Sequence, residues 1–427
     1  MSRPRRGLWR HHDFLKLWAG QATSLFGSFV GSFAFDLAAI LTLHASPAQI
    51  AVLNGCLLVP GLLAGPWIGL WADRVRRRPL LIGADLGRAL LLLSVPLAAV
   101  SGRLTLLQLD GVAAAGSVLT VLFDVSYRAY LPALVGTDHI IEANSRLQAT
   151  EAVTEASGWG IAGILVQLFT APIVVAIDAL SFVISALSLL TLRTEVRVAP
   201  HSADPHWWRD IREGAAAIRR DGILFALATT TFAWDLAGNV IGVVIVLFFV
   251  REMHVPPAFL GPLFGFGGIS ALLGALLAQR LARRFPLGRL LVGSVWFDMV
   301  GLLPVLILFG PFSLPITLLM AATGQASDGG RSIYTVHSTS LLQSRVPDRV
   351  AGRVNAAFTT ISSIAMVLGL IAGGYLGATI GIRGTLLVAV IADLFVPLCL
   401  VFSPVRTLGT RRGESVAAWL HEAGPTR

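Results

Sequence analysis

The sequence predicts an all-α membrane protein with twelve transmembrane helices. Of its 427 residues, 55% are hydrophobic and only 13% are charged, whereas soluble domains carry roughly 25% charged residues. The mean hydropathy is +0.74. The apolar residues gather in twelve segments, each long enough to cross a bilayer. This composition excludes a soluble protein held by a single anchor.

The twelve predicted spans follow one another with short connections. The first and seventh are longer than a bilayer requires, so we expect them to tilt or to extend beyond it. The predicted spans are residues 14–43, 49–72, 79–100, 104–128, 141–168, 171–192, 220–250, 257–281, 287–309, 313–338, 353–378 and 383–403.

The net charge of +9 comes almost entirely from arginine, and Lys16 is the only lysine. The arginines lie in alternate connections, in the N-terminal arm and in the C-terminal tail, while the intervening connections are nearly free of them. Loops rich in arginine stay on the cytoplasmic side. We therefore expect a multi-pass protein of the cytoplasmic (inner) membrane with both termini in the cytoplasm, and no nucleic-acid partner.

The longest connection, 193–219, divides the chain near its middle. Trp207, Ile211, Ala215 and Ile218 fall at helical spacing within it and are flanked by arginines. This pattern predicts an amphipathic helix at the membrane interface. The predicted organisation is a first half at 1–192, a linker at 193–219, a second half at 220–403 and a cytoplasmic tail at 404–427.

The two halves repeat some of their features. Asp124 and Arg128 end the fourth predicted span, and Asp328 and Arg331 lie late in the tenth. Asn144 and Asn355, each following a proline near the start of a span, are 211 residues apart. Parallel repeats of this kind build transporters from two related bundles. We expect two six-helix bundles with pseudo-two-fold symmetry.

The connection between the second and third spans carries the most specific pattern. Gly69-Leu-Trp-Ala-Asp73-Arg74-Val-Arg76-Arg77-Arg78 resembles the loop 2–3 signature of the major facilitator superfamily of secondary transporters. One position departs, because the family usually has glycine where this chain has Arg76. Arg128-Ala-Tyr-Leu-Pro132 and Asp178-Ala-Leu-Ser-Phe182 are similar to a subgroup of exporters of macrolides, tetracycline and enterobactin.

The resemblance implies the major facilitator fold, alternating access and a proton gradient as the driving force. It implies a monomer in the lipid bilayer that exports a small amphiphilic compound, such as a drug, an antibiotic or a siderophore. An importer, or a carrier of lysolipids or metabolites with the same fold, remains the alternative. No cofactor is expected.

The resemblance also implies a gate at the cytoplasmic surface. Asp73 ends the second helix and Arg353 begins the eleventh, so these charges should meet when that side is shut. Asp124 is then the expected partner of Arg77 or Arg78. The expected gating residues are Gly69, Asp73, Arg74, Arg77, Arg78, Asp124 and Arg353.

Carboxylates inside a span are costly and mark candidate functional sites. Gln21, Ser28, Ser32 and Asp36 share one face of the first span. Two interpretations of Asp36 stay open: a site for a proton or a cationic substrate, and a structural hydrogen bond to a neighbouring helix.

The other candidates lie in the fifth, seventh and tenth spans. Glu151 and Glu155 are one turn apart and repel when both are ionised, which favours proton binding by one of them; a helix that begins later would instead leave both at the surface. Asp235 lies near the middle of its span. Asp328 and Arg331 are either a self-contained ion pair or part of the site.

The remaining charged residues are interpreted as structural: the pair Asp85 and Arg88, and the aspartates Asp178, Asp298 and Asp393. Several chemistries are excluded by pattern. The only lysine follows Leu15, so a Gly-Lys-Ser/Thr phosphate loop is missing. The sequence has no Ser/His/Asp constellation and no metal-ligand spacing. We expect no catalytic residue, no metal site and no enzyme.

Overall fold

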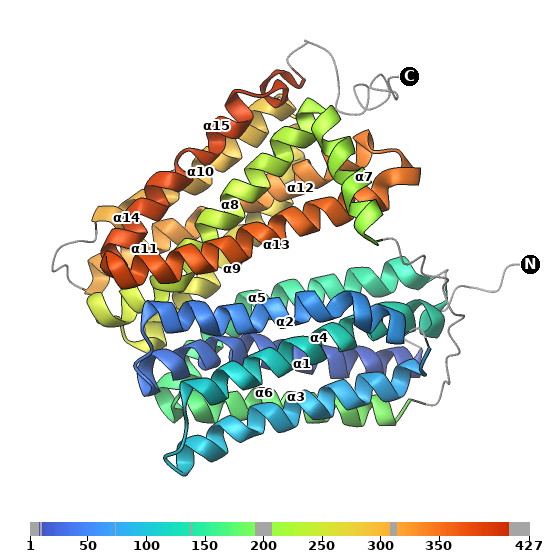
Figure 1. Ribbon diagram of the computed structural model, residues 1–427, viewed down its shortest axis with the longest axis vertical. Coiled ribbons are helices and arrows are strands. Elements are labelled where there is room, and N and C mark those ends of the chain that lie inside the picture. The colour runs from blue at the N-terminus through green and yellow to red at the C-terminus, as the bar shows by residue number, and fades with distance from the viewer. Residues whose placement is uncertain are drawn as a thin grey trace, which may run out of the picture. The chain divides into compact units, whose positions relative to one another are not determined.

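The computed structural model describes residues 8, 11–72, 74–136, 139–192, 207–307 and 314–409, and the described part is helical throughout its regular structure (Figure 1). The first helices are α1 (His12–Leu37), a π-helical turn η2 (Ala38–Thr42), α2 (Pro47–Ala72), α3 (Arg77–Val100), α4 (Leu106–Val135), α5 (Ile140–Phe169) and α6 (Ala171–Leu190). They are followed by α7 (Trp207–Arg220), α8 (Gly222–Leu247), a second π-helical turn η4 (Phe248–Glu252), α9 (Pro257–Ala282) and α10 (Leu287–Ile307). The last are α11 (Leu314–Ala326), α12 (Asp328–Arg345), α13 (Asp348–Thr379), α14 (Gly381–Asp393), α15 (Val396–Val401) and the 3₁₀ turn η5 (Pro404–Thr407).

Eleven helical segments in the described residues are long and apolar enough to cross a membrane. The tenth predicted span, 313–338, is instead divided between α11 and α12, which meet at Ser327. The Ser327 hydroxyl donates back to the Gly324 carbonyl at 2.5 Å. A serine that bonds its own backbone and the glycines around it favour a break in the helix.

The helices form two units. Unit 1 comprises Met1–Ala203 with Pro256–Gly265, and unit 2 comprises Asp204–Val255 with Phe266–Arg427. The four-part division predicted from the sequence stays a prediction. The N-terminal arginines, most of the linker (193–206) and the tail beyond residue 409 lie outside the described residues.

Each unit begins its series of spans in the same way. α1 ends in the π-helical turn η2 and α8 ends in η4, and both turns are five residues long. After each turn comes a histidine with positive φ, His44 at 51° and His254 at 53°. These two histidines are 210 residues apart, within one residue of the offset of the two asparagines. The internal repeat is therefore visible in backbone geometry as well as in sequence.

The linker helix α7 buries part of its predicted apolar face within unit 2. Ile218 is only 2% exposed and packs in a cluster with Leu224, Val354 and Ala357. The absence of a side chain at Gly214 makes this possible, since a Cβ there would lie 2.1 Å from the Arg353 carbonyl oxygen. α7 is a packed element of unit 2.

A single carboxylate fixes the junction between α7 and α8. Asp221 accepts hydrogen bonds from the backbone N–H groups of Ile223 and Leu224, at 2.8 and 3.2 Å, and pairs with Arg345 at 2.8 Å. Burial acts to raise the pKa of Asp221, but these donors outweigh it and the pKa lies below its ordinary value. The carboxylate is therefore ionised at neutral pH and caps α8.

Candidate functional site

Helices α1 and α6 of unit 1 approach each other closely. Gly27 and Gly31 of α1 face Ser181 and Asp178 of α6: a Cβ at Gly27 would lie 2.1 Å from the Ser181 hydroxyl, and one at Gly31 would lie 2.4 Å from the Asp178 Cβ. Small residues let helices approach closely in membranes. The glycines therefore bring a carboxylate of α6 against the polar face of α1.

The carboxylate of Asp178 is buried and hydrogen-bonded. Ser28 of α1 donates to its Oδ1 at 3.4 Å and Ser181 donates to the same atom at 3.2 Å. Asp178 is 5% exposed. The sequence left open a structural hydrogen bond from Asp36 to a neighbouring helix. In the structure, Ser28 on the same polar face of α1 makes such a hydrogen bond, to Asp178 of α6.

Arg88 of α3 is the basic centre of this region. It forms an ion pair with Asp85, which is fully buried. Its guanidinium lies over the rings of Phe123 and Phe182, with 4.6 and 4.1 Å to the ring centroids. Asp178 and Asp124 lie within electrostatic reach of the same arginine. The sequence predicted the Asp85–Arg88 pair but did not predict its place among aromatic rings and further carboxylates.

A cavity of about 400 Å³ opens beside this arginine. Its polar lining comes from Ser28, Ser32, Arg88, Ser117, Thr120 and Asp178, and apolar residues of α1, α2, α3, α4 and α6 make the rest. Pockets of this size and composition bind small molecules, with the few polar groups fixing orientation. This cavity suits a small compound with an apolar body and one polar or charged group.

Asp36 does not line the cavity. It lies near the end of α1, just before η2, and its Oδ1 is buried. Within the described residues it has neither a hydrogen bond nor an ion pair. Gln21, on the same face, likewise has a buried Oε1 without a partner. An unpartnered carboxylate in a membrane helix is the arrangement in which a proton or a cation is bound most readily.

Glu151 and Glu155 lie in the middle of α5, because that helix begins at Ile140. The sequence had left open a later start that would put both glutamates at the membrane surface. Both side chains are exposed within unit 1. A carboxylate that faces lipid is unfavourable. The role of the two glutamates as a proton carrier, as against a place at the membrane surface, stays a prediction.

Unit 2 has its own basic centre at Arg331 of α12. Its guanidinium pairs with Asp235 of α8 at 3.5 Å and lies over the Trp234 ring, 5.1 Å from the centroid. Ser362 of α13 donates to the other oxygen of Asp235 at 2.5 Å. The sequence left open whether Asp328 and Arg331 form a self-contained pair or belong to the site; the ion pair that the structure gives Arg331 crosses between helices.

Further aspartates surround the same arginine. Asp298 of α10 is 5% exposed and Asp393 of α14 is 2% exposed, and both lie within electrostatic reach of Arg331. Asp328 lies against α9, where a Cβ on Gly267 would meet its Oδ2. Each unit thus has an arginine with several aspartates around it.

The expected gating residues are only partly assembled. Asp73 lies outside the described residues. Arg353 pairs with Asp210 and Glu213 of α7, at 3.1 and 2.5 Å. The pairing of Asp73 with Arg353 stays a prediction.

Arg78, one of the two proposed partners of Asp124, donates to the Leu189 and Leu190 carbonyls at the end of α6, at 2.9 and 2.6 Å. The pairing of Asp124 with Arg77 or Arg78 stays a prediction. Asp124 is not at the end of the fourth helix, because α4 continues to Val135. The added turns are apolar, and Tyr130 and Leu134 are buried in the core of unit 1.

The remaining gating residues lie around the same connection. Gly69 is in the last turn of α2, Arg74 follows the helix in an exposed turn, and Arg77 begins α3 as a buried residue. Among the residues that the structure describes, no group of three or more histidine, cysteine or acidic side chains is arranged to hold a metal ion.

The chain belongs to the Major Facilitator Superfamily, whose family model matches residues 17–370. It is 25% identical over 395 residues to macrolide efflux protein A of Streptococcus pyogenes, covering 88% of this chain and 94% of that protein. It is 26% identical over 385 residues to the MFS-type transporter YfiS of Bacillus subtilis, covering 88% and 89%.

Solved structures show the same fold. A bacterial homologue of the iron transporter ferroportin in an inward-facing state superposes with a TM-score of 0.74 at 18% identity, over 91% of this chain and 98% of that one. A nucleoside transporter superposes with a TM-score of 0.72 at 13% identity, over 91% and 98%. The chain is a membrane transporter, as the sequence predicted, and not an enzyme.

Proposed function

We propose that this transporter exports a small amphiphilic compound of the macrolide type by alternating access, driven by the proton gradient. The observation that carries the proposal is the excess of carboxylates over arginine inside apolar helices. In unit 1, Asp85, Asp124 and Asp178 surround Arg88 beside the cavity. In unit 2, Asp235, Asp298 and Asp393 surround Arg331.

Such clusters cannot be neutral with every carboxylate ionised. In unit 1, Arg128 also lies within electrostatic reach of Asp124, so two arginines face three aspartates. In unit 2, Arg331 faces three aspartates. An unbalanced negative charge within a membrane span is unfavourable. Proton uptake or a cationic substrate supplies the missing positive charge. In a carrier that exchanges a proton for an amphiphilic cation, the same carboxylates bind the proton in one step of the transport cycle and the cation in the other. The names of the relatives from Streptococcus pyogenes and Enterococcus faecalis support the direction and the substrate class.

The direct test is drug accumulation in a bacterial host that lacks its own efflux pumps. Cells that express the chain should accumulate less macrolide and less cationic dye than cells with the empty vector. An uncoupler of the proton gradient should abolish the difference. Unchanged accumulation across a broad panel would remove the exporter proposal, and higher accumulation would favour the alternative, an importer.

Asp36→Asn is expected to abolish proton-driven transport without reducing the amount of protein in the membrane. The substitution keeps size and hydrogen bonding but removes titration, and no partner in the described residues depends on the charge. The measurement is transport in proteoliposomes as a function of internal and external pH. Asp36→Glu, which still titrates, should retain part of the activity.

Normal pH dependence in Asp36→Asn would exclude Asp36 as the proton site. Glu151→Gln together with Glu155→Gln, tested in the same assay, then examines the other candidate carrier. A double variant with wild-type pH dependence would eliminate that pair as well.

A further inference from the structure

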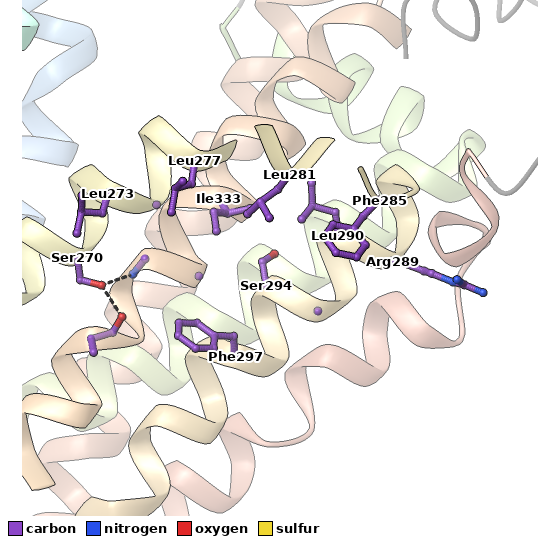
Figure 2. Close-up of a pocket in the computed structure, with 15 residues that line it drawn as sticks. Ser270, Leu273, Leu277, Leu281, Phe285, Arg289, Leu290, Ser294, Phe297 and Ile333 are labelled. Carbon is purple, nitrogen blue, oxygen red and sulfur yellow. Dashed lines mark hydrogen bonds between the residues drawn. The ribbon is translucent and has the colours of Figure 1, made fainter. Parts of the chain in front are cut away.

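Unit 2 contains a second cavity, about 480 Å³ in volume, that the transport proposal does not use (Figure 2). It is a groove between α9, α10 and α12. Its walls are almost wholly apolar: Leu273, Leu277, Phe285 and Phe297 line it and are 43% to 57% exposed. An open apolar groove on helices that cross a membrane faces acyl chains.

Small residues form the floor of the groove. Gly274 of α9 contacts α12 so closely that a Cβ would lie 2.2 Å from the Gly329 carbonyl oxygen, and a Cβ on Gly330 would lie 2.5 Å from the Ser294 carbonyl oxygen. Gly293 of α10 lines the groove differently, since nothing lies within 4 Å of the place its Cβ would take. The hollow therefore exists because these glycines carry no side chain.

The groove extends from Ser270 at one end to Leu281, Phe285 and the charged Arg289 at the other. From Ser270 to Leu281 along α9 it runs eleven residues, about 16 Å at the rise of an α-helix. That is close to half of the roughly 30 Å hydrocarbon core, the depth of one leaflet. Arg289 lies at the end occupied by Leu281 and Phe285 (Figure 2).

Three more arginines belong to the same turn: Arg280, Arg283 and Arg284, all exposed. The segment from Gln279 to Leu290 contains no acidic residue. None of the four arginines makes a salt bridge or a side-chain hydrogen bond in the part of the chain that the structure describes. By contrast, Arg345 and Arg353 of the same unit are paired with carboxylates. As far as the described residues go, the four arginines are therefore available to an external anion.

We propose that the groove between α9, α10 and α12 binds an anionic phospholipid, with one acyl chain in the groove and the phosphate headgroup at the Arg280–Arg289 cluster. The length of the groove matches one leaflet and the charge at its mouth is complementary to the headgroup. Arginine binds phosphate through paired N–H donors. Basic residues beside membrane helices attract anionic lipids.

Native mass spectrometry of the purified transporter tests the proposal with dioleoylphosphatidylglycerol as the probe and dioleoylphosphatidylcholine as the neutral comparison. The wild-type protein should retain the anionic lipid in preference to the neutral one. Replacement of Arg283, Arg284 and Arg289 by glutamine should remove that preference, because the loss of each arginine is expected to lower the affinity for the anionic lipid about fivefold. The matched control is Arg219→Gln with Arg220→Gln, exposed arginines at the end of α7.

A second variant tests the acyl groove without touching charge. Gly293→Leu fills the open space and should reduce retention of both lipids at this site. Gly83→Leu is its control: Gly83 is also the seventh residue of its helix, is exposed and has nothing within 4 Å of a Cβ. The arginine variants are at the surface and test the proposal even where Gly293→Leu fails to fold.

Three outcomes would overturn the proposal. Equal retention of the two lipids by the wild type would exclude a site selective for anionic lipid. Unchanged lipid retention by the arginine triple variant or by folded Gly293→Leu would place the lipid elsewhere. A dimer that Gly293→Leu dissociates would identify a second copy of the chain as the occupant. The experiment measures lipid binding and not transport. A negative result would therefore overturn the lipid proposal and leave the proposed export activity unaffected.

Discussion

An Arg88→Leu variant is expected to be markedly less stable than the wild type, with a lower melting temperature and a lower yield of folded protein. Its partner Asp85 is fully buried, and removal of one member of a buried ion pair costs about 3–5 kcal/mol. That is a large part of the roughly 5–15 kcal/mol that holds a protein domain folded. The measurement is the yield of monodisperse protein in mild detergent, together with its melting temperature.

Two further variants show whether charge or packing is responsible. Asp85→Leu combined with Arg88→Leu removes both charges and should recover much of the lost stability. Arg88→Lys keeps the charge but loses the planar stacking on Phe123 and Phe182, so it should lie between the wild type and Arg88→Leu. A single Arg88→Leu variant as stable as the wild type would mean that the pair contributes little.

Gly31→Val is expected to separate α1 from α6 and to leave little correctly folded protein. A Cβ at this position would lie 2.4 Å from the Cβ of Asp178, an atom fixed to the backbone of α6. Overpacking typically costs about 1–3 kcal/mol and more where the backbone must move. Size-exclusion profiles and thermal unfolding of the purified variant measure the loss.

The matched control for this variant is Gly111→Val in α4. Gly111 is also within a membrane helix, but it is exposed and nothing lies within 4 Å of its Cβ position. This control should keep the wild-type yield. If Gly31→Val and Gly111→Val behave alike, the close approach of α1 and α6 is not essential to the fold.

The existence of the helices could be predicted because it depends on local information. A run of apolar residues the length of a bilayer is sufficient, and clustered arginines mark one of its two ends. The break at Ser327 was not predicted, because hydropathy averages over the residues that interrupt a helix. The two π-helical turns at 38–42 and 248–252 leave no signal in hydropathy either.

The partners of the charged residues could not be predicted in the same way. Sequence spacing proposes pairs within one helix, and this is correct for Asp85 with Arg88. Arg331 instead pairs with Asp235, 96 residues away, because helix packing decides which faces meet. Asp178 was interpreted as structural, yet it lines the cavity. Gly31 leaves room for the Asp178 carboxylate, but this role can be recognised only when the helix that faces it is known.

The two π-helical turns also bear on the history of the chain. In a turn of this kind each N–H group bonds to the carbonyl group five residues back instead of four. The same helix ending stands in α1–η2 and in α8–η4, and each is followed by a histidine in the left-handed conformation. Two independent origins of this ending at equivalent places are less economical than one. We infer that the ending was already present in an ancestral half-length gene, and that duplication of that gene copied it into both halves.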